Sequence, residues 1–240
     1  MRSLDLFSGI GGFARGFHAA GIETVAFCDS DPAARCVLQK HWPDIPVYHD
    51  VRDITRERLL ADGIPRPNII SGGFPCQDIS IANPKAVGLD GERSGLWWEF
   101  HRIVEEIHPE FVVAENSPQL RSRGLDRLLG SLDALGYDAE WHCIPAAALG
   151  APHRRDRLWI VAYARSAGLA TSEREALLSP GWWQERGATS QRCRWPAEPN
   201  VGRVAHGLPG RVHRLRLLGN SVVPIIPQLI GEAIRARAAS

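Results

Sequence analysis

The sequence has very little lysine and no long apolar run. Lys40 and Lys85 are the only lysines among 28 basic residues, so nearly every positive charge is an arginine. No apolar run approaches the ~20 residues that span a bilayer. Asp5 interrupts the first apolar run, which argues against a secretory signal peptide. We therefore expect a cytoplasmic protein with no membrane partner.

The sequence also lacks paired cysteines. Its five cysteines are scattered along the chain with no C-x-x-C pair, so neither a zinc site nor a disulfide framework is indicated. Cys28, Cys36 and Cys143 lie in or beside apolar segments, as small buried hydrophobic residues do. We predict no metal site. Cys76 differs from these three because it follows an apolar run on a Gly-Gly-Phe-Pro loop.

Positive charge is concentrated in the C-terminal part of the chain. Residues 1–150 hold 14 basic and 21 acidic residues, whereas residues 151–240 hold 14 and 6, so the two parts carry −7 and +8. Coding by GC-rich DNA would explain why arginine is used in place of lysine, but not why the two parts differ in the sign of their charge. Guanidinium groups bind phosphate in a fork and stay charged. The pattern favours a nucleic-acid partner.

Short apolar runs alternate with amphipathic stretches over the first 163 residues. This alternation predicts an α/β fold, a doubly wound and mostly parallel sheet with helices on both faces. Ligands bind such sheets at the carboxyl ends of their strands. The predicted strands are 3–7, 23–28, 46–49, 68–71, 110–116, 138–144 and 157–164. One predicted helix follows the first strand and ends near residue 20, and another begins near residue 32. The other main predicted helices span 96–107, 119–135 and 224–238.

The alternation stops after residue 164 and returns near residue 218. Residues 165–217 are rich in Gly, Pro, Trp and Arg with weak periodicity. We predict one catalytic domain formed by 1–164 plus 218–240, with 165–217 as a small irregular subdomain. The tryptophans of this segment, Trp182, Trp183 and Trp195, are expected to form its own small core.

The first strand is followed by a glycine turn typical of nucleotide binding. Gly9, Gly11 and Ala14 fit the spacing G-x-G-x-x-G/A, in which glycine lets a ligand approach the backbone. Asp29 ends the second strand, where an acidic side chain can take ribose hydroxyls. Asp50 closes the third strand and could accept from an adenine amino group. These residues predict an adenosine-containing cofactor, either a nicotinamide nucleotide or S-adenosylmethionine.

Four reactive side chains are expected at the same edge of the sheet. Cys76 follows the fourth strand, Glu115 ends the fifth, and Arg155 and Arg157 precede or begin the last. A free thiol is a few per cent thiolate at neutral pH, yet it is intrinsically very nucleophilic. A nucleophile, a carboxyl group and two guanidiniums thus form a candidate catalytic site.

The motifs DLFSGIGG, GGFPCQ, RSGLW (93–97), ENS (115–117), R-x-R and LGNSVVP (218–224) resemble, in order, those of the cytosine-5 DNA methyltransferases. The resemblance covers roughly 1–164 and 215–240. It implies a Rossmann-like methyltransferase fold that uses S-adenosylmethionine. Long motifs in register over so much of a chain are more specific than any one of them.

The resemblance implies a role for each matching residue. Cys76 attacks carbon 6 of a flipped-out cytosine, Glu115 holds nitrogen 3 and the exocyclic amine, and Arg157 holds the carbonyl oxygen. Arg155 orients Cys76 or the DNA backbone. The implied cofactor-binding residues are Phe7, Gly9, Ile10, Gly12, Asp29, Asp50, Pro75, Leu96, Asn220 and Ser221, and the predicted DNA-binding residues are Gln77, Lys85, Arg93, Arg186, Arg192 and Arg194.

Three features depart from the family pattern. Ser30 stands where a bulky side chain often stacks on adenine, so either cofactor affinity is lower or another side chain, such as Phe27, compensates. His153 replaces a usual glutamine. The segment 165–217 is short for a target recognition region, which is a feature expected of a phage or mobile-element enzyme.

Several functions remain open at this point. The leading hypothesis is a sequence-specific methyltransferase acting on double-stranded DNA, expected to be a nucleoid-associated monomer in a bacterial or phage-infected cell, with a cognate restriction endonuclease encoded elsewhere as a candidate partner. The alternatives are RNA cytosine methylation by the same chemistry, a non-catalytic DNA-binding relative, and a nicotinamide-dependent enzyme that uses the same glycine turn.

Overall fold

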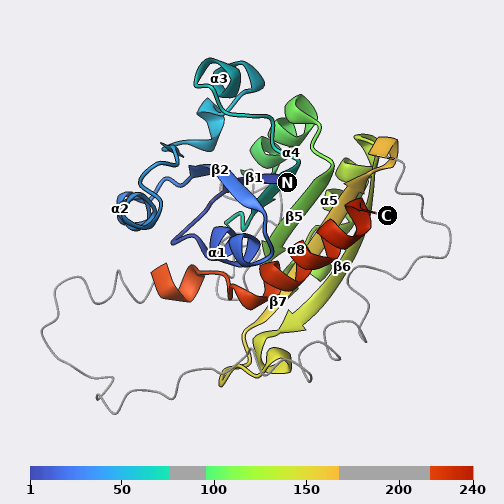
Figure 1. The fold of residues 1–240 in the computed structure, drawn as a ribbon. Coiled ribbons are helices and arrows are strands. Elements are labelled where there is room, and N and C mark those ends of the chain that lie inside the picture. The colour runs from blue at the N-terminus through green and yellow to red at the C-terminus, as the bar shows by residue number, and fades with distance from the viewer. Residues whose placement is uncertain (76–95, 168–216, 240) are drawn as a thin grey trace, which may run out of the picture.

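The computed structural model describes residues 1–75, 96–167 and 217–239 of the 240-residue chain (Figure 1). Its centre is a seven-stranded sheet with the order β3-β2-β1-β4-β5-β7-β6. This architecture confirms the predicted α/β class. The strands are β1 (Arg2–Leu6), β2 (Glu23–Cys28), β3 (Val47–Tyr48), β4 (Ile69–Gly72), β5 (Phe111–Asn116), β6 (Tyr137–Pro145) and β7 (Asp156–Ala164).

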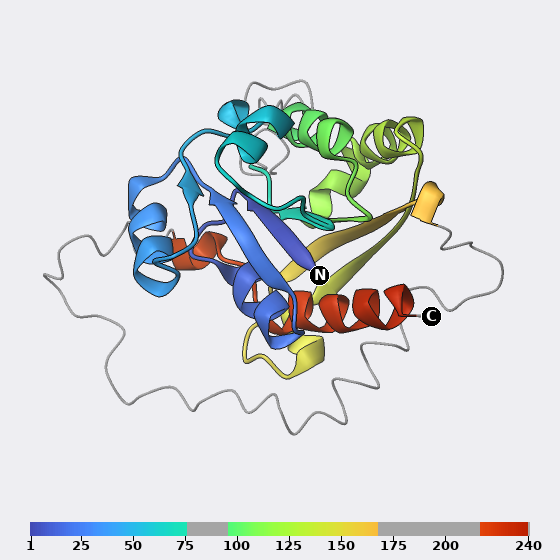
Figure 2. The ribbon, with the colours of Figure 1, turned by 45° about the horizontal axis from the view of Figure 1, so that its top comes forward.

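Helices cover both faces of the sheet, as Figures 1 and 2 show from two directions. One hydrophobic core joins the sheet to α3, α4 and α5, and a second joins it to α1 and α8. A third, small cluster joins α2 to β2 and α1. The helices are α1 (Gly12–Ala19), α2 (Pro32–His41), α3 (Arg56–Ala61), α4 (Leu96–Ile107), α5 (Leu125–Ala134) and α8 (Ile225–Ala238).

The direction of β7 matters for the site. Strands β1 to β5 pair in parallel, whereas β7 pairs antiparallel with both β5 and β6. Because β7 runs backwards, its first residues lie beside the last residues of β5, and Asn116 pairs with Leu158. The sheet therefore brings the start of β7 to the edge where the parallel strands end.

Local sequence signals explain where the elements begin. The side chain of Asp31 accepts a hydrogen bond from Ala33 N at 2.9 Å and caps α2, with Pro32 at the first helical position, as predicted. The predicted helix 119–135 is instead a 3₁₀ turn, η3 (Pro118–Ser122), followed by α5. Gly124 separates them with a φ of +135°, which L side chains rarely adopt. The sequence prediction also missed α3.

The last helix has the composition of a membrane span. The segment Leu217–Ala238 is long and apolar enough to cross a bilayer, with a mean hydropathy of 1.4 over a window of 18 residues, whereas the sequence prediction had found no such run. Residues 221–224 interrupt its helical conformation, however, and the side chains of Ile226, Ile230 and Ile234 are buried in the second core. A helix packed in this way is typical of a protein interior.

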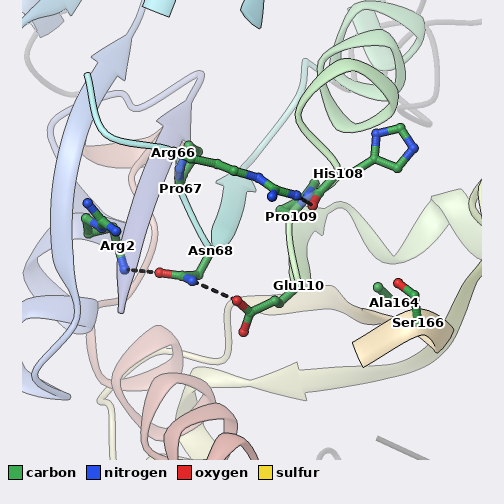
Figure 3. Close-up of a pocket in the computed structure, with 9 residues that line it drawn as sticks. All are labelled: Arg2, Arg66, Pro67, Asn68, His108, Pro109, Glu110, Ala164 and Ser166. Carbon is green, nitrogen blue, oxygen red and sulfur yellow. Dashed lines mark hydrogen bonds between the residues drawn. The ribbon is translucent and has the colours of Figure 1, made fainter. Parts of the chain in front are cut away.

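The amino ends of the parallel strands are tied together by side chains (Figure 3). Asn68 accepts from the backbone N of Arg2 at 3.0 Å and donates to Glu110 at 2.8 Å. Arg66 donates to the carbonyl oxygens of Ile107 and His108 at the end of α4, at 3.1 and 2.6 Å. These contacts line a cavity of about 350 Å³ at the edge of the sheet opposite the candidate active site. We interpret this cavity as a structural feature, because the polar side chains Asn68 and Arg66 that line it join neighbouring parts of the fold.

The predicted recognition segment, 165–217, lies almost entirely outside the described residues, and Trp182, Trp183 and Trp195 lie within it. Strand β7 ends at Ala164, and the described chain resumes at residue 217. The division into a catalytic domain and a recognition subdomain therefore stays a prediction.

Candidate active site

A crevice of about 730 Å³ opens at the carboxyl ends of β1, β4 and β5. The glycine turn and the start of α2 form one side of it. The ends of β4 and β5, with the start of β7, form the other side. The predicted site residues that line it are Phe7, Gly9, Asp29, Pro75, Glu115, Arg157 and Asn220. Two groups of predicted residues, for cofactor and for target, thus share one cavity.

Glu115 and Arg157 form an ion pair on the side of the crevice predicted for the target. The Nε atom of Arg157 lies 2.8 Å from Oε1 of Glu115. Burial raises the pKa of Glu115 to about 7, although the positive charges of Arg157 and Arg155 act in the opposite direction. The carboxyl group is therefore poised to exchange a proton near neutral pH.

The backbone of Gly73 packs closely against the side chain of Glu115. A Cβ atom added at Gly73 would lie 2.9 Å from Oε2 of Glu115. Asn116 donates from Nδ2 to the carbonyl oxygen of Phe74 at 3.2 Å, and its own side-chain oxygen accepts from Ser117 N at 2.8 Å. Asn116 therefore fixes the end of β5 to the loop that leads toward Cys76.

Several predicted residues lie outside the described part of the chain. Cys76 directly follows Pro75, the last described residue before the gap, so its place in the crevice stays a prediction. The same holds for the predicted DNA-binding residues Gln77, Lys85, Arg93, Arg186, Arg192 and Arg194.

The glycine turn and Asp29 form the side of the crevice that is predicted to hold the cofactor. One carboxylate oxygen of Asp29 accepts from Gly9 N at 2.7 Å, and the other accepts from Asp31 N at 2.8 Å. Burial raises the pKa of Asp29. A carboxylate has about four lone-pair sites, so each oxygen can accept a further hydrogen bond, as from a ribose hydroxyl.

The turn itself fits an approaching ligand. Gly9 has a φ of +55°, and no atom lies within 4 Å of the position that a Cβ would occupy there. Phe7 also has a positive φ, +52°. Gly11, in contrast, faces inward, because a Cβ there would lie 2.5 Å from the ring of Trp42. The open side of the turn at Gly9 is compatible with a nucleotide cofactor.

Other predicted cofactor residues do not line the crevice. Asp50 accepts from Arg52 N at 3.0 Å and caps the short 3₁₀ helix η1 (Val51–Asp53). Leu96 packs against the first core. Ile10 is half-buried within the turn and does not line the cavity.

Two further predicted residues lie where the C-terminal segment packs on α1. Gly12 is buried against Val222, because a Cβ at Gly12 would lie 2.6 Å from the carbonyl oxygen of that residue. Ser221 is half-buried next to it and donates from N to Leu218 O at 3.3 Å. Arg155 points to this segment, donating to the carbonyl oxygen of Gly219 at 2.8 Å and to that of Ser221.

The sequence reasoning missed some lining residues. Pro32 and Ala34 line the side predicted for the cofactor, together with Ser30, which the sequence had placed there, and all three side chains are small. Phe27 cannot replace a stacking residue at position 30, because it is fully buried and packs against Trp42 with ring centroids 5.3 Å apart. Leu217 also lines the crevice. Proximity to the LGNSVVP motif was the only signal for it.

No group of three His, Cys, Asp or Glu side chains within residues 1–75, 96–167 and 217–239 could hold a metal ion.

Comparisons with known proteins point in one direction. The profile of the family described as C-5 cytosine-specific DNA methylase matches residues 1–184. The type II methyltransferase M2.BsuMI of Bacillus subtilis is 35% identical over 170 residues, covering 68% of this chain and 42% of that protein. M.AquIA of Picosynechococcus is 33% identical over 174 residues, covering 66% and 70%.

Solved structures agree with this picture. A candidate DNA modification methyltransferase from an Escherichia coli prophage superposes with a TM-score of 0.61 at 26% identity, covering 72% of this chain and 49% of that one. DNMT2 of Spodoptera frugiperda shares the fold, with a TM-score of 0.59 at 19% identity over 73% and 53% of the two chains. The chain spans less than half the length of several of its relatives, such as 42% of M2.BsuMI.

Proposed function

We propose a function in DNA methylation, on the premise that this chain belongs to the family of C-5 cytosine-specific DNA methylases. The proposed reaction is methylation of carbon 5 of a cytosine in a specific double-stranded DNA sequence. The observation that carries the proposal is the ion pair of Glu115 and Arg157 in the same crevice as the glycine turn and Asp29.

The target base has to leave the duplex before these side chains can reach it. Flipping out a base costs a few kcal/mol. In the crevice, Glu115 in its neutral form donates to nitrogen 3 of the cytosine, and Arg157 holds Glu115 in place and binds the ring carbonyl oxygen. Both contacts withdraw electron density from the ring, which makes carbon 6 more electrophilic.

The thiolate of Cys76 then adds to carbon 6, and carbon 5 becomes nucleophilic. S-adenosylmethionine, when bound, supplies the electrophilic methyl group that carbon 5 takes up. A base, water-mediated in our proposal, removes the proton from carbon 5, and Cys76 leaves as a thiolate while the ring double bond re-forms. A thiolate suits both steps because it is a strong nucleophile that also leaves readily.

The described residues provide places for the cofactor. Gly9 and Phe7 form the open turn, Asp29 can accept from ribose hydroxyls, and Asn220 lines the cavity from the C-terminal side. The small side chains of Ser30, Pro32 and Ala34 offer no aromatic stacking partner on the part of the wall that they form. We propose a cofactor affinity at the weak end of the family for this reason.

The partners belong to the same proposal. Residues 165–217 are proposed to read the DNA sequence, because they are arginine-rich and each bidentate contact to a guanine edge is worth ~1–3 kcal/mol of discrimination. We also propose that the protein acts as a cytoplasmic monomer, with a cognate restriction endonuclease as a candidate partner.

Bisulfite sequencing of DNA from cells that express the protein tests the proposal directly. Methylated cytosines within one recurring sequence are expected. In parallel, labelled S-adenosylmethionine is incubated with purified protein and either duplex DNA or RNA. If label were found only in RNA, then RNA would replace DNA as the proposed substrate. Tight duplex binding with no transfer to any sequence would favour the non-catalytic alternative.

A further inference from the structure

Arg155 lies two residues before Arg157, yet it makes contacts in a different part of the molecule. Whereas Arg157 pairs with Glu115, the Nη2 atom of Arg155 donates to the carbonyl oxygens of Gly219 and Ser221, the first at 2.8 Å. Both acceptors belong to the C-terminal segment 217–223. Nothing in the comparisons assigns a role to this contact.

The backbone at Arg155 has an unusual conformation. Arg155 has a φ of +38°, a conformation that residues other than glycine rarely adopt. It directly precedes β7, which begins at Asp156. Residues held in sparsely populated backbone conformations cost of order 1–3 kcal/mol and persist where the surrounding structure over-determines them.

The segment 217–223 is also held from its other side by α1. A Cβ at Gly12 would lie 2.6 Å from the carbonyl oxygen of Val222. Further along, a Cβ at Gly16 would lie 2.3 Å from the carbonyl oxygen of Pro224. The segment is therefore packed directly on the helix that follows the glycine turn, with Arg155 fastening it from the β6–β7 turn.

This segment is part of the crevice wall. Leu217 and Asn220 line the cavity that Gly9 and Asp29 also line. A guanidinium that binds two carbonyl oxygens fixes the backbone between them, and Asn220 lies in that interval. Small displacements of such a wall change how well a ligand fits, because supporting contacts orient the groups that bind.

We infer that Arg155 is a positioning residue for the cofactor, which clamps the segment 217–223 against the glycine-turn helix and so fixes Asn220 at the crevice. The two arginines of the R-x-R motif then divide their work. Arg157 acts on the target side through Glu115, and Arg155 acts on the cofactor side through the backbone of Gly219 and Ser221. This inference rests on the proposed function, because it takes S-adenosylmethionine as the ligand.

Calorimetry with the purified full chain and S-adenosylmethionine tests the inference. Arg155→Ala is expected to weaken cofactor binding by about 10- to 100-fold, because the segment 217–223 loses the charge-assisted hydrogen bonds that Arg155 donates to Gly219 and Ser221. Arg154→Ala is the matched control, because its guanidinium is exposed and pairs with Asp156. It is expected to bind the cofactor like the wild type. Unchanged affinity in Arg155→Ala would overturn the inference.

Kinetics and hydrogen exchange separate positioning from a general folding defect. Arg155→Ala is expected to raise KM for the cofactor while leaving kcat at saturating cofactor within about twofold, since a uniform binding contact affects KM alone. Amides 219–223 are expected to exchange faster in the variant, with the protection of β5 unchanged. A loss of kcat at unchanged cofactor affinity would instead place Arg155 on the target side.

The conservative variant Arg155→Lys covers the case in which Arg155→Ala does not fold. It keeps the charge but presents one ammonium in place of the guanidinium fork, and its cofactor affinity is expected to lie between those of alanine and arginine. If Arg155→Lys bound S-adenosylmethionine as tightly as the wild type does, the guanidinium fork would not be needed, which would contradict this part of the inference. If the wild-type protein bound no S-adenosylmethionine, the proposed function would be wrong. Hydrogen exchange of amides 219–223 in the wild type and the variant would still test whether Arg155 holds the segment.

Discussion

Arg157 and Glu115 face each other across two antiparallel strands, with Nε and Oε1 2.8 Å apart, at the end of β5 and the start of β7. Forty-one intervening residues separate them in sequence, so only the inverted strand brings them together. The pair is also mostly buried: the side chain of Glu115 is 12% exposed and that of Arg157 is 31% exposed. Because the pKa of Glu115 is raised to about 7, small changes in pH decide whether its carboxyl group is neutral or charged. The first two predictions follow from this.

Glu115→Gln is expected to slow methyl transfer by about 10²–10⁴-fold, the usual contribution of a positioned acid or base. Glutamine keeps the shape of the side chain and can donate a hydrogen bond, but it cannot transfer a proton to nitrogen 3. The rate is measured as label transferred to duplex DNA under single-turnover conditions. Cofactor affinity, measured separately, should stay within about threefold of wild type, since Glu115 lies on the target side. Turnover equal to the wild type would remove Glu115 from the mechanism.

The pH dependence of kcat/KM should show a descending limb centred near pH 7, because this ratio reports the pKa values of the free enzyme. The pKa of Glu115 is raised to about 7 by burial, so the neutral acid disappears as the pH rises through that value. The same shift makes the folded protein bind more protons than the unfolded chain between about pH 4.5 and 7, so its contribution to stability falls as the pH rises across that window. A pH–rate profile in which Glu115→Gln keeps the same descending limb would contradict the assignment.

Cys76→Ala should abolish transfer while leaving cofactor affinity nearly unchanged, because the thiol reacts with the base and does not bind the cofactor. A duplex that carries 5-fluorocytosine at the target position should trap the wild-type enzyme as a covalent adduct, since fluorine cannot leave as a cation. The adduct is measured as a band that resists denaturing electrophoresis. Its absence on a duplex that is otherwise a good substrate would count against thiol addition.

Gly16→Ala is expected to destabilise the fold by ~1–3 kcal/mol, the usual cost of overpacking. An added Cβ would lie 2.3 Å from Pro224 O and 2.8 Å from Gln228 N, which are backbone atoms of the α1–α8 contact. Gly130→Ala in α5 is the matched control, because no atom lies within 4 Å of the added Cβ. It should stabilise the protein by ~0.5–1 kcal/mol through helix propensity. Thermal or urea unfolding measures both, and equal effects would contradict the packing argument.

Periodicity and punctuation were enough to predict most elements of the fold. Alternating apolar runs predicted all seven strands, and Asp31-Pro32 predicted the start of α2, because strand and cap signals are local and need no tertiary contact. The short helix α3 was missed because six residues carry too few repeats to show a period. Gly124 split the predicted helix 119–135 through its positive φ, which a helical pattern does not reveal.

The sequence by itself determined the family, the class of fold and the pairing of a glycine turn with an acidic strand end, because these depend on residue type and spacing along the chain. Only the tertiary structure decided which arginine meets Glu115, that Arg155 instead fastens the segment 217–223, and that Phe27 is buried beneath Trp42. Residue type alone does not distinguish Arg155 from Arg157. The antiparallel direction of β7 and the positive φ of Arg155 place the two guanidinium groups against different neighbours. Such long-range geometry depends on how the whole sheet packs.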